Sequence, residues 1–231
     1  MLAISGGMTQ APASTQPPMK VAILPVTPLQ QNCTLLWCTA TMKAAVVDPG
    51  GDLERIKALI AKAGVSVEKL LITHGHLDHC GGAAQLAREL GVPIEGPHEA
   101  DQFWIAQLAE DSGRWGVPAE IFTPDRWLNN GDTVTVGNLT LQVAHCPGHT
   151  PGHVVFFHEP SRFAVVGDVL FQGGIGRWDF PLGNFDDLVN SITGRLWPMG
   201  DDVMFNPGHG PRSTFGQERA TNPYVGDAAL A

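Results

Sequence analysis

The segment THGHLDHCGG contains four side chains that can ligate metal ions in a stretch of six residues: His74, His76, Asp78 and His79. They follow the hydrophobic run VEKLLIT, so we expect them on a loop at the end of a strand, where alternate side chains can converge on a rigid support. Burying so many polar groups together is costly unless a metal ion pairs with them. The motif therefore predicts a metal centre. Imidazole and carboxylate ligands favour zinc, with iron and manganese as alternatives.

Three later residues also lie where loops follow predicted strands: His149 in CPGHTPGH, Asp168 in VVGDVLF and His209 in NPGHG. Burying a carboxylate at the end of the apolar strand FAVVGD costs free energy unless the carboxylate ligates metal, and an aspartate that bridges two ions would offset that cost. The sequence thus predicts two divalent ions with a shared ligand. One ion is expected on His74, His76, His149 and Asp168, and the other on Asp78, His79, Asp168 and His209.

Such a site predicts a hydrolase. Divalent metal ions lower the pKa of a bound water toward about 7, so a metal-bridging hydroxide would attack a carbonyl carbon at neutral pH, with Asp78 and Asp168 as the catalytic side chains. A thiol with a pKa of about 8.5 can leave as a thiolate with little proton donation. We see no evident general acid for expelling an amine, although Asp78 or a metal-bound water could serve. Thioester hydrolysis is therefore the predicted reaction.

The elements that must position these residues form two successive groups of strands, each followed by helices. Strand-like patterns are VAILPV, CTLLWC, KAAVV and VEKLLIT in the first group, and TVTV, LTLQVA, HVVFFHE, RFAVVGD and DVMF in the second. Helices are predicted from Asp52, as a capping residue, to Ala63, and over residues 82–90, 100–110 and 185–196. This order predicts an α/β fold with two sheets packed face to face and helices outside.

Composition narrows the class of protein further. With 231 residues, we expect one catalytic domain over residues 20–231, after a disordered tail over residues 1–19 that is rich in Ala, Pro, Ser, Thr and Gln. Met1, Met8 and Met19 are alternative starts. The net charge is −9, and the sequence has no cluster of Lys and Arg of the kind that nucleic-acid-binding proteins usually present. A nucleic acid is therefore not expected as a partner. A small-molecule substrate is the predicted partner.

The four cysteines form no CxxC pair, so the sequence predicts no disulfide framework and a reducing, cytoplasmic location. Cys80 and Cys146 stand beside the ligand segments and are interpreted as packing residues, as are the other two. No membrane partner is expected, and both a monomer and a homodimer fit the sequence. His98, His145, His153 and His158 are assigned structural or surface roles.

The ordered set HxHxDH, His, Asp and His resembles the metallo-β-lactamase superfamily from Lys20 onward, and within it the short, single-domain glyoxalase II-like (hydroxyacylglutathione hydrolase) branch. Supporting segments are PVTPLQQNC, VVDPGG, CPGHTPGH, GIGRWDFPLGN and TNPYV. The resemblance implies a four-layer αββα sandwich, the seven metal ligands above, and S-lactoylglutathione as the thioester. Two departures stand out: the chain ends soon after His209, without the helical domain that binds glutathione in the full-length enzymes, and Trp178 occupies the third position of the usual GRTD motif.

Five further residues are candidates for support or substrate contact. Asp48 and Asp179 could orient metal-bound histidines, because such histidines commonly donate their other N–H to a carboxylate. Asp48 is equally interpreted as a turn residue before Pro49. Arg177 would either hold a substrate carboxylate or pair with Asp179, and the second is favoured. By resemblance alone, Asn222 and Tyr224 would line the substrate mouth.

Other activities share these residues. A persulfide dioxygenase would use one iron on the residues equivalent to His74, His76 and His149, and a lactonase or another acyl hydrolase would use the same pair of ions. A true β-lactamase normally lacks an aspartate at the bridging position, so Asp168 argues against it. Metal identity and oxygen consumption separate the dioxygenase from the hydrolases.

Overall fold

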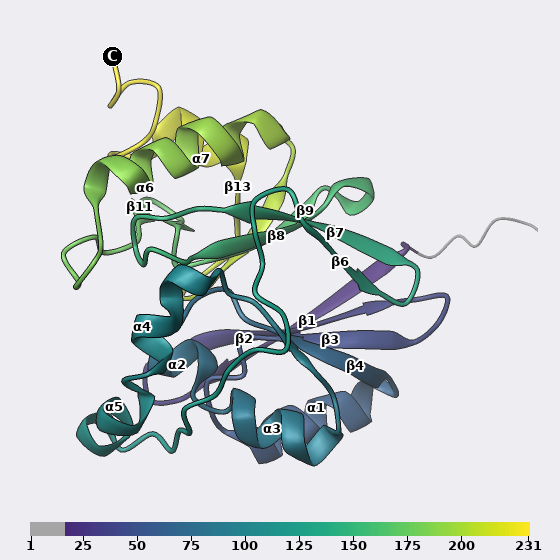
Figure 1. Ribbon diagram of the computed structural model, residues 1–231. Coiled ribbons are helices and arrows are strands. Elements are labelled where there is room, and N and C mark those ends of the chain that lie inside the picture. The colour runs from purple at the N-terminus through teal and green to yellow at the C-terminus, as the bar shows by residue number, and fades with distance from the viewer. Residues whose placement is uncertain (1–16) are drawn as a thin grey trace, which may run out of the picture.

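Two β-sheets face each other in the computed structural model, which describes residues 17–231 (Figure 1). In the first sheet, β1 to β3 are antiparallel and β3 to β5 are parallel. Its strands, in spatial order, are β1 (Met19–Val26), β2 (Gln31–Cys38), β3 (Lys43–Val47), β4 (Ser66–Leu71) and β5 (Ile94–Glu95).

The second sheet is mostly antiparallel, with β12 parallel to β9. Its strands, in spatial order, are β13 (Ser213–Thr214), β12 (Met204–Pro207), β9 (Phe163–Gly167), β8 (Val154–His158), β7 (Leu139–His145) and β6 (Thr133–Val136). A separate short hairpin consists of β10 (Leu170–Phe171) and β11 (Gly174–Ile175).

Helices cover the outer face of each sheet (Figure 1). Below the first sheet lie α1 (Leu53–Ala63) and α3 (Ala83–Leu90). Above the second lie α6 (Phe185–Ser191), which continues into η3 (Ile192–Leu196), and α7 (Phe215–Thr221). The remaining helices are α2 (Leu77–Cys80), η1 (Glu99–Asp101), α4 (Gln102–Ile105), α5 (Leu108–Trp115), η2 (Glu159–Ser161) and η4 (Trp197–Met199).

Each layer boundary has its own hydrophobic core. Because side chains alternate along a strand, Leu35 of β2 faces the helices below the first sheet while Leu36 faces the second sheet. The core between the sheets includes Leu36, Val47, Val136 and Phe156; the other two include Ile56, Ile72 and Leu86, and Leu188, Phe205 and Phe215. The predicted four-layer αββα sandwich is confirmed.

Two predictions about helices were wrong. Residues 100–110 do not form one helix: the chain makes η1, α4 and α5 in succession, and the buried Asp101 turns its carboxylate onto neighbouring loops. Asp52 precedes α1 as expected but does not cap it through its side chain; its carboxylate accepts from the Thr27 N–H and pairs with Arg55 instead.

Of the tail predicted over residues 1–19, residues 1–16 lie outside the described residues. Its last part is ordered, because Met19 begins β1 and the Pro18 carbonyl accepts a hydrogen bond from the Thr39 N–H. All four cysteines are buried, as expected for packing residues, and their thiols are free. No helix within residues 17–231 has the length and apolar character needed to cross a membrane.

Candidate metal centre

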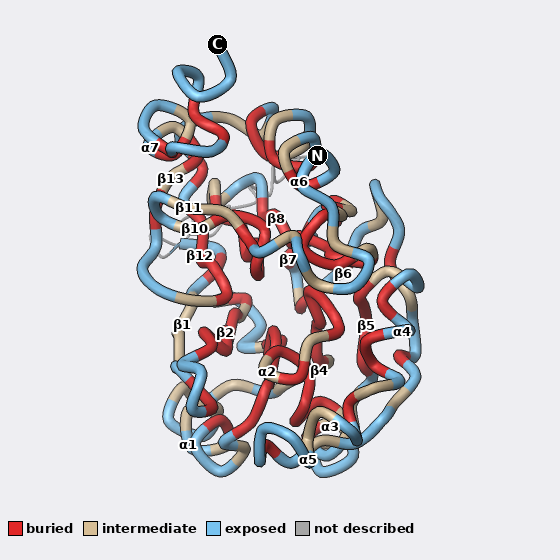
Figure 2. The backbone as a smooth tube through the Cα atoms, turned by 90° about the vertical axis from the view of Figure 1, so that its left-hand side faces the viewer, coloured by how far each residue is buried: buried red, intermediate tan, exposed pale blue. Residues whose placement is uncertain are grey.

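The seven predicted ligands lie on loops and on the short helix α2 at one end of the sandwich, and Figure 2 looks onto this end. His74, His76, Asp78 and His79 lie between β4 and the end of α2. His149 follows β7, and Asp168 and His209 follow β9 and β12. Both sheets therefore deliver ligands to one place, and the segments that carry them are largely buried.

The first triad consists of His74, His76 and His149, whose ligand atoms all lie within 4.8 Å of one another. His149 Nε2 is 3.0 Å from His76 Nδ1. Burial lowers the pKa of all three histidines, that of His76 to about 3. They are therefore neutral at pH 7, which is the form in which imidazole binds a metal ion.

The second triad consists of Asp78, His79 and His209, again with ligand atoms within 4.8 Å of one another. Asp78 Oδ2 is 3.1 Å from His209 Nε2 and 3.8 Å from His79 Nε2. Burial opposes a charge on His79, but the Asp168 and Asp78 carboxylates more than offset this and raise the pKa of His79 well above its ordinary value. The surroundings of His79 thus favour a positive charge.

Asp168 lies between the two triads. Its Oδ1 is 3.3 Å from His79 Nε2, and its Oδ2 is 3.6 Å from His149 Nε2 and 3.7 Å from His209 Nε2. The structure therefore brings all seven predicted ligands together, with this carboxylate in the shared position. Gly208 makes the close approach possible, because a Cβ there would be 2.0 Å from Asp168 Oδ1.

The Nδ1 atoms of four histidines are held by acceptors outside the cluster. His149 donates to the Arg177 carbonyl at 2.7 Å and His209 to the Leu29 carbonyl at 3.2 Å. A proton on Nδ1 leaves Nε2 with a free lone pair, and in both residues Nε2 faces Asp168. Hydrogen bonds of this kind fix the tautomer and orientation of metal-binding histidines.

Asp48 provides the same support to both triads. One of its oxygens accepts from His79 Nδ1 at 2.9 Å and from the Thr73 hydroxyl at 2.6 Å, and that hydroxyl in turn contacts His74 Nδ1 at 3.0 Å. Asp48 also has a left-handed backbone, with φ 53°. The structure therefore combines the two roles considered for it: it occupies a turn before Pro49, and its carboxylate supports ligand histidines.

The unpaired polar atoms of the cluster fit a bound metal. Within the described residues, the buried His74 Nε2, His79 Nε2 and Asp168 Oδ1 have no hydrogen-bond partner. Three carboxylates, those of Asp48, Asp78 and Asp168, surround His79. Bare imidazole nitrogens beside concentrated negative charge are costly to bury without a cation. The donor set of nitrogen and oxygen atoms suits zinc, iron or manganese.

Asp101 is a supporting residue that the sequence analysis missed. Its side chain is buried and accepts from the Gly75 N–H at 2.8 Å, the Thr150 hydroxyl at 2.8 Å and the Gly152 N–H at 2.5 Å. Gly75 separates two ligands and Thr150 follows a third, so one carboxylate ties both loops of the first triad together. Burial raises the pKa of Asp101 to about 6 despite these hydrogen bonds. Its position inside a predicted helix concealed this role.

The four other histidines do not offer ligand atoms to the cluster. His153 is buried, stacks on His74 with ring centroids 4.6 Å apart, and accepts from the Asp168 N–H at 3.0 Å. His145 stacks on His98, and His158 is buried at the end of β8. Their structural roles agree with the sequence analysis, although His153 lies closer to the site than expected.

The remaining candidates lie away from the cluster. Arg177 and Asp179 are exposed and form an ion pair at 2.8 Å, so the Arg177 carbonyl, and not the Asp179 carboxylate, orients His149. Asn222 is buried and donates to the Gly174 carbonyl and to Glu218. Tyr224 is exposed, with its ring 6.2 Å from that of Trp178. The structure does not bring these side chains to the metal cluster.

Comparisons with known proteins agree with this site. A family model described as the Metallo-beta-lactamase superfamily matches residues 26–209. Hydroxyacylglutathione hydrolase GloC of Haemophilus influenzae is 44% identical over 209 residues, covering 90% of this chain and 98% of that protein. The crystal structure of BLEG-1 B3 metallo-beta-lactamase is similar at a TM-score of 0.82 and 32% identity, covering 89% of this chain and 99% of that one.

A second solved structure, that of TTHA1623 in a di-iron-bound form, has a TM-score of 0.78 and 32% identity, covering 88% of this chain and 99% of that one. The family match spans all seven residues of the cluster, from the HxHxDH segment to His209. This chain therefore belongs to the Metallo-beta-lactamase superfamily and is a metal-dependent hydrolase.

Proposed function

We propose that this chain is a thioesterase of the hydroxyacylglutathione hydrolase type, which holds two zinc ions and hydrolyses S-lactoylglutathione. The observation that carries the proposal is the complete set of seven ligand side chains, with Asp168 within 3.7 Å of histidines from both triads. The relative named hydroxyacylglutathione hydrolase GloC supports the substrate class, because this chain aligns with 98% of its length.

The protein's own residues prepare the site for attack on a carbonyl. His74, His76 and His149 would hold one ion, Asp78, His79 and His209 the other, and Asp168 would be shared. When bound, the ions act as Lewis acids and make a coordinated water nucleophilic near pH 7. Asp48, Thr73 and the Arg177 carbonyl keep the ligand lone pairs directed inward, so little reorganisation is needed during the reaction.

A thiolate leaving group suits the open side of the cluster. The pocket beside it is lined by the ligands His76 and Asp78, and its other ionisable lining residues, Asp111 and Arg114, lie within 3.9 Å of each other. An amine would need a proton in order to leave, whereas a thiol of pKa about 8.5 leaves as the anion. This difference supports a thioester over an amide as the substrate.

Metal analysis by mass spectrometry, paired with thiol release from S-lactoylglutathione, tests the proposal. We expect two zinc ions per chain and release of free thiol that a chelator abolishes and added zinc restores. A single iron per chain with oxygen uptake on glutathione persulfide would instead indicate the dioxygenase. If the metal-loaded protein cleaves a lactone or a β-lactam but no acyl-thiol, the thioesterase proposal is wrong and another acyl hydrolase of this fold takes its place.

A further inference from the structure

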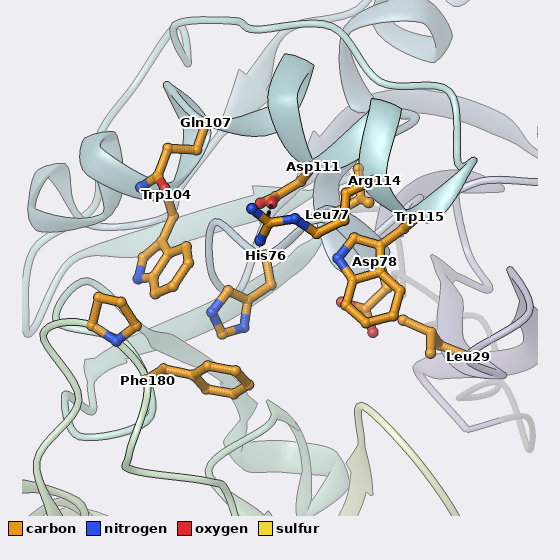
Figure 3. A pocket seen from close by; sticks show the side chains of 11 residues that line it. Leu29, His76, Leu77, Asp78, Trp104, Gln107, Asp111, Arg114, Trp115 and Phe180 are labelled. Atoms are coloured by element: carbon orange, nitrogen blue, oxygen red, sulfur yellow. Dashed lines mark ion pairs between the residues drawn. The ribbon is translucent and has the colours of Figure 1, made fainter.

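A pocket of about 310 Å³ opens directly beside the metal cluster (Figure 3). Two of the proposed ligands, His76 from the first triad and Asp78 from the second, form part of its wall. Its volume is at the lower end of the range of about 300 to 1,000 Å³ typical of small-molecule sites. Because two ligands form part of its wall, the part of the substrate that binds in this pocket would lie next to the carbonyl that is hydrolysed.

Three aromatic side chains form part of the remaining wall. Trp104 of α4 and Phe180 meet the His76 imidazole edge-on, with ring centroids 4.5 and 5.0 Å from it. Trp115, at the end of α5, lines the side near Asp78 and Leu29. Phe180 is itself covered by the Arg177 guanidinium, 4.1 Å from its ring centroid. The pocket thus presents aromatic surfaces next to the reacting centre.

Charge is scarce in this pocket and already paired. Among the described residues that line it, Arg114 is the only Lys or Arg, and it lies 3.3 Å from Glu110 and 3.9 Å from Asp111. Glutathione carries two carboxylates and one ammonium, and transferring such charges into an apolar space without partners is costly. The carrier is therefore better placed outside the pocket, which leaves the acyl side of the thioester to fill it.

We propose, on the basis of the thioesterase function above, that this pocket binds the acyl group and selects thioesters whose acyl group is apolar, particularly those with a ring. S-Lactoylglutathione remains a substrate, but its lactoyl group is small and carries a hydroxyl, so it would leave the aromatic walls largely uncovered. One methylene in a hydrophobic pocket changes kcat/KM by about tenfold or more. A phenylacetyl group should therefore be preferred over lactoyl by at least about tenfold.

Two substrate series test which side of the thioester fills the pocket. The first keeps glutathione and varies the acyl group through lactoyl, butyryl and phenylacetyl, while the second keeps phenylacetyl and varies the thiol through glutathione, coenzyme A and N-acetylcysteamine. We expect kcat/KM of the zinc-loaded enzyme to rise along the first series and to change less along the second. Rates that follow the thiol and ignore the acyl group would overturn the inference, because the pocket would then hold the carrier.

Trp115→Ala links the preference to the pocket. The side chain is 61% exposed, so its removal should leave the fold intact. We expect the phenylacetyl-to-lactoyl ratio of kcat/KM to fall at least fivefold, mainly through a higher KM for phenylacetyl, and Trp115→Phe to restore most of it. The matched control is Ile121→Ala, a similarly exposed apolar residue that does not line the pocket, and its ratio should stay at the wild-type value.

The possible failures are distinguishable. Hydrolysis of every acyl group at similar rates, or a Trp115→Ala ratio equal to that of the wild type, overturns the acyl-pocket inference and leaves the thioesterase function standing. Failure of the metal-loaded enzyme to hydrolyse any thioester overturns both.

Discussion

The two triads of the metal cluster differ in how firmly the protein holds them. In the first triad, His74 and His149 are 0% and 3% exposed, and the buried Asp101 ties their loops together. In the second, the His209 side chain is 30% exposed, and its Nδ1 bonds to the carbonyl of Leu29, an exposed loop residue. Because a buried, multiply bonded ligand is better preorganised, we expect the first triad to bind its ion more tightly.

Asp168→Ala is expected to have the largest effect, because it removes the carboxylate that lies between the two triads and would be shared by both ions. Metal ions contribute several kcal/mol of charge stabilisation in the transition state, so we expect kcat to fall by two to three orders of magnitude or more. Steady-state thiol release, measured after zinc reconstitution, checks this. If the variant keeps two ions per chain and near wild-type kcat, then the shared position assigned to Asp168 is wrong.

A pair of single-ligand variants compares the triads directly. We expect His209→Ala to lose only the second ion and retain about one zinc per chain, whereas His74→Ala should lose the more tightly held ion. Chelator competition followed by metal analysis measures the affinity of each remaining site. Equal affinities in the two variants would remove the distinction between a tight first triad and a weak second one.

Asp101→Asn tests whether the hydrogen bonds of Asp101, which is not itself a proposed ligand, account for tighter metal binding at the first triad. The amide can accept at only one atom, so at least one donor among Gly75, Thr150 and Gly152 loses its partner. Losing such outer support typically weakens metal binding by 10- to 100-fold, and we expect this loss at the first triad only. Asp111→Asn, in an ion pair on α5, is a control that should leave zinc affinity unchanged. Equal weakening at both triads would contradict the assigned role.

The smallest effect is expected for Asp179→Ala. Its carboxylate is exposed, and within the described residues its one ion-pair partner is Arg177. Exposed ion pairs contribute about 0 to 1 kcal/mol to stability. Metal content should stay the same, and kcat/KM should change less than about fivefold. A tenfold or larger rise in KM, with kcat intact, would show instead that this pair contacts the substrate.

Local sequence patterns were sufficient to predict much of the fold and the members of the cluster. The strand in FAVVGD ends directly before Asp168, as predicted, whereas the strand in VEKLLIT ends at Leu71, three residues before His74. The structure brings the seven predicted ligand side chains together in space, and the signal that pointed to them was a ligand-type group in a segment that follows an apolar strand. The single helix predicted over residues 100–110 is divided by a turn at Ala106 and Gln107, between α4 and α5, because local helical propensity is a weak preference that tertiary contacts override.

The sequence by itself determined which residue types meet at the strand ends, since apolar runs and HxHxDH spacing are local properties of the chain. Only the tertiary structure decided what surrounds them. It brought Asp101 against Gly75 and Thr150, placed Arg177 so that its carbonyl and not Asp179 orients His149, and directed Asn222 away from the site. It also gathered Trp104, Trp115 and Phe180 into one pocket. These contacts join segments far apart in the sequence, so no local pattern encodes them.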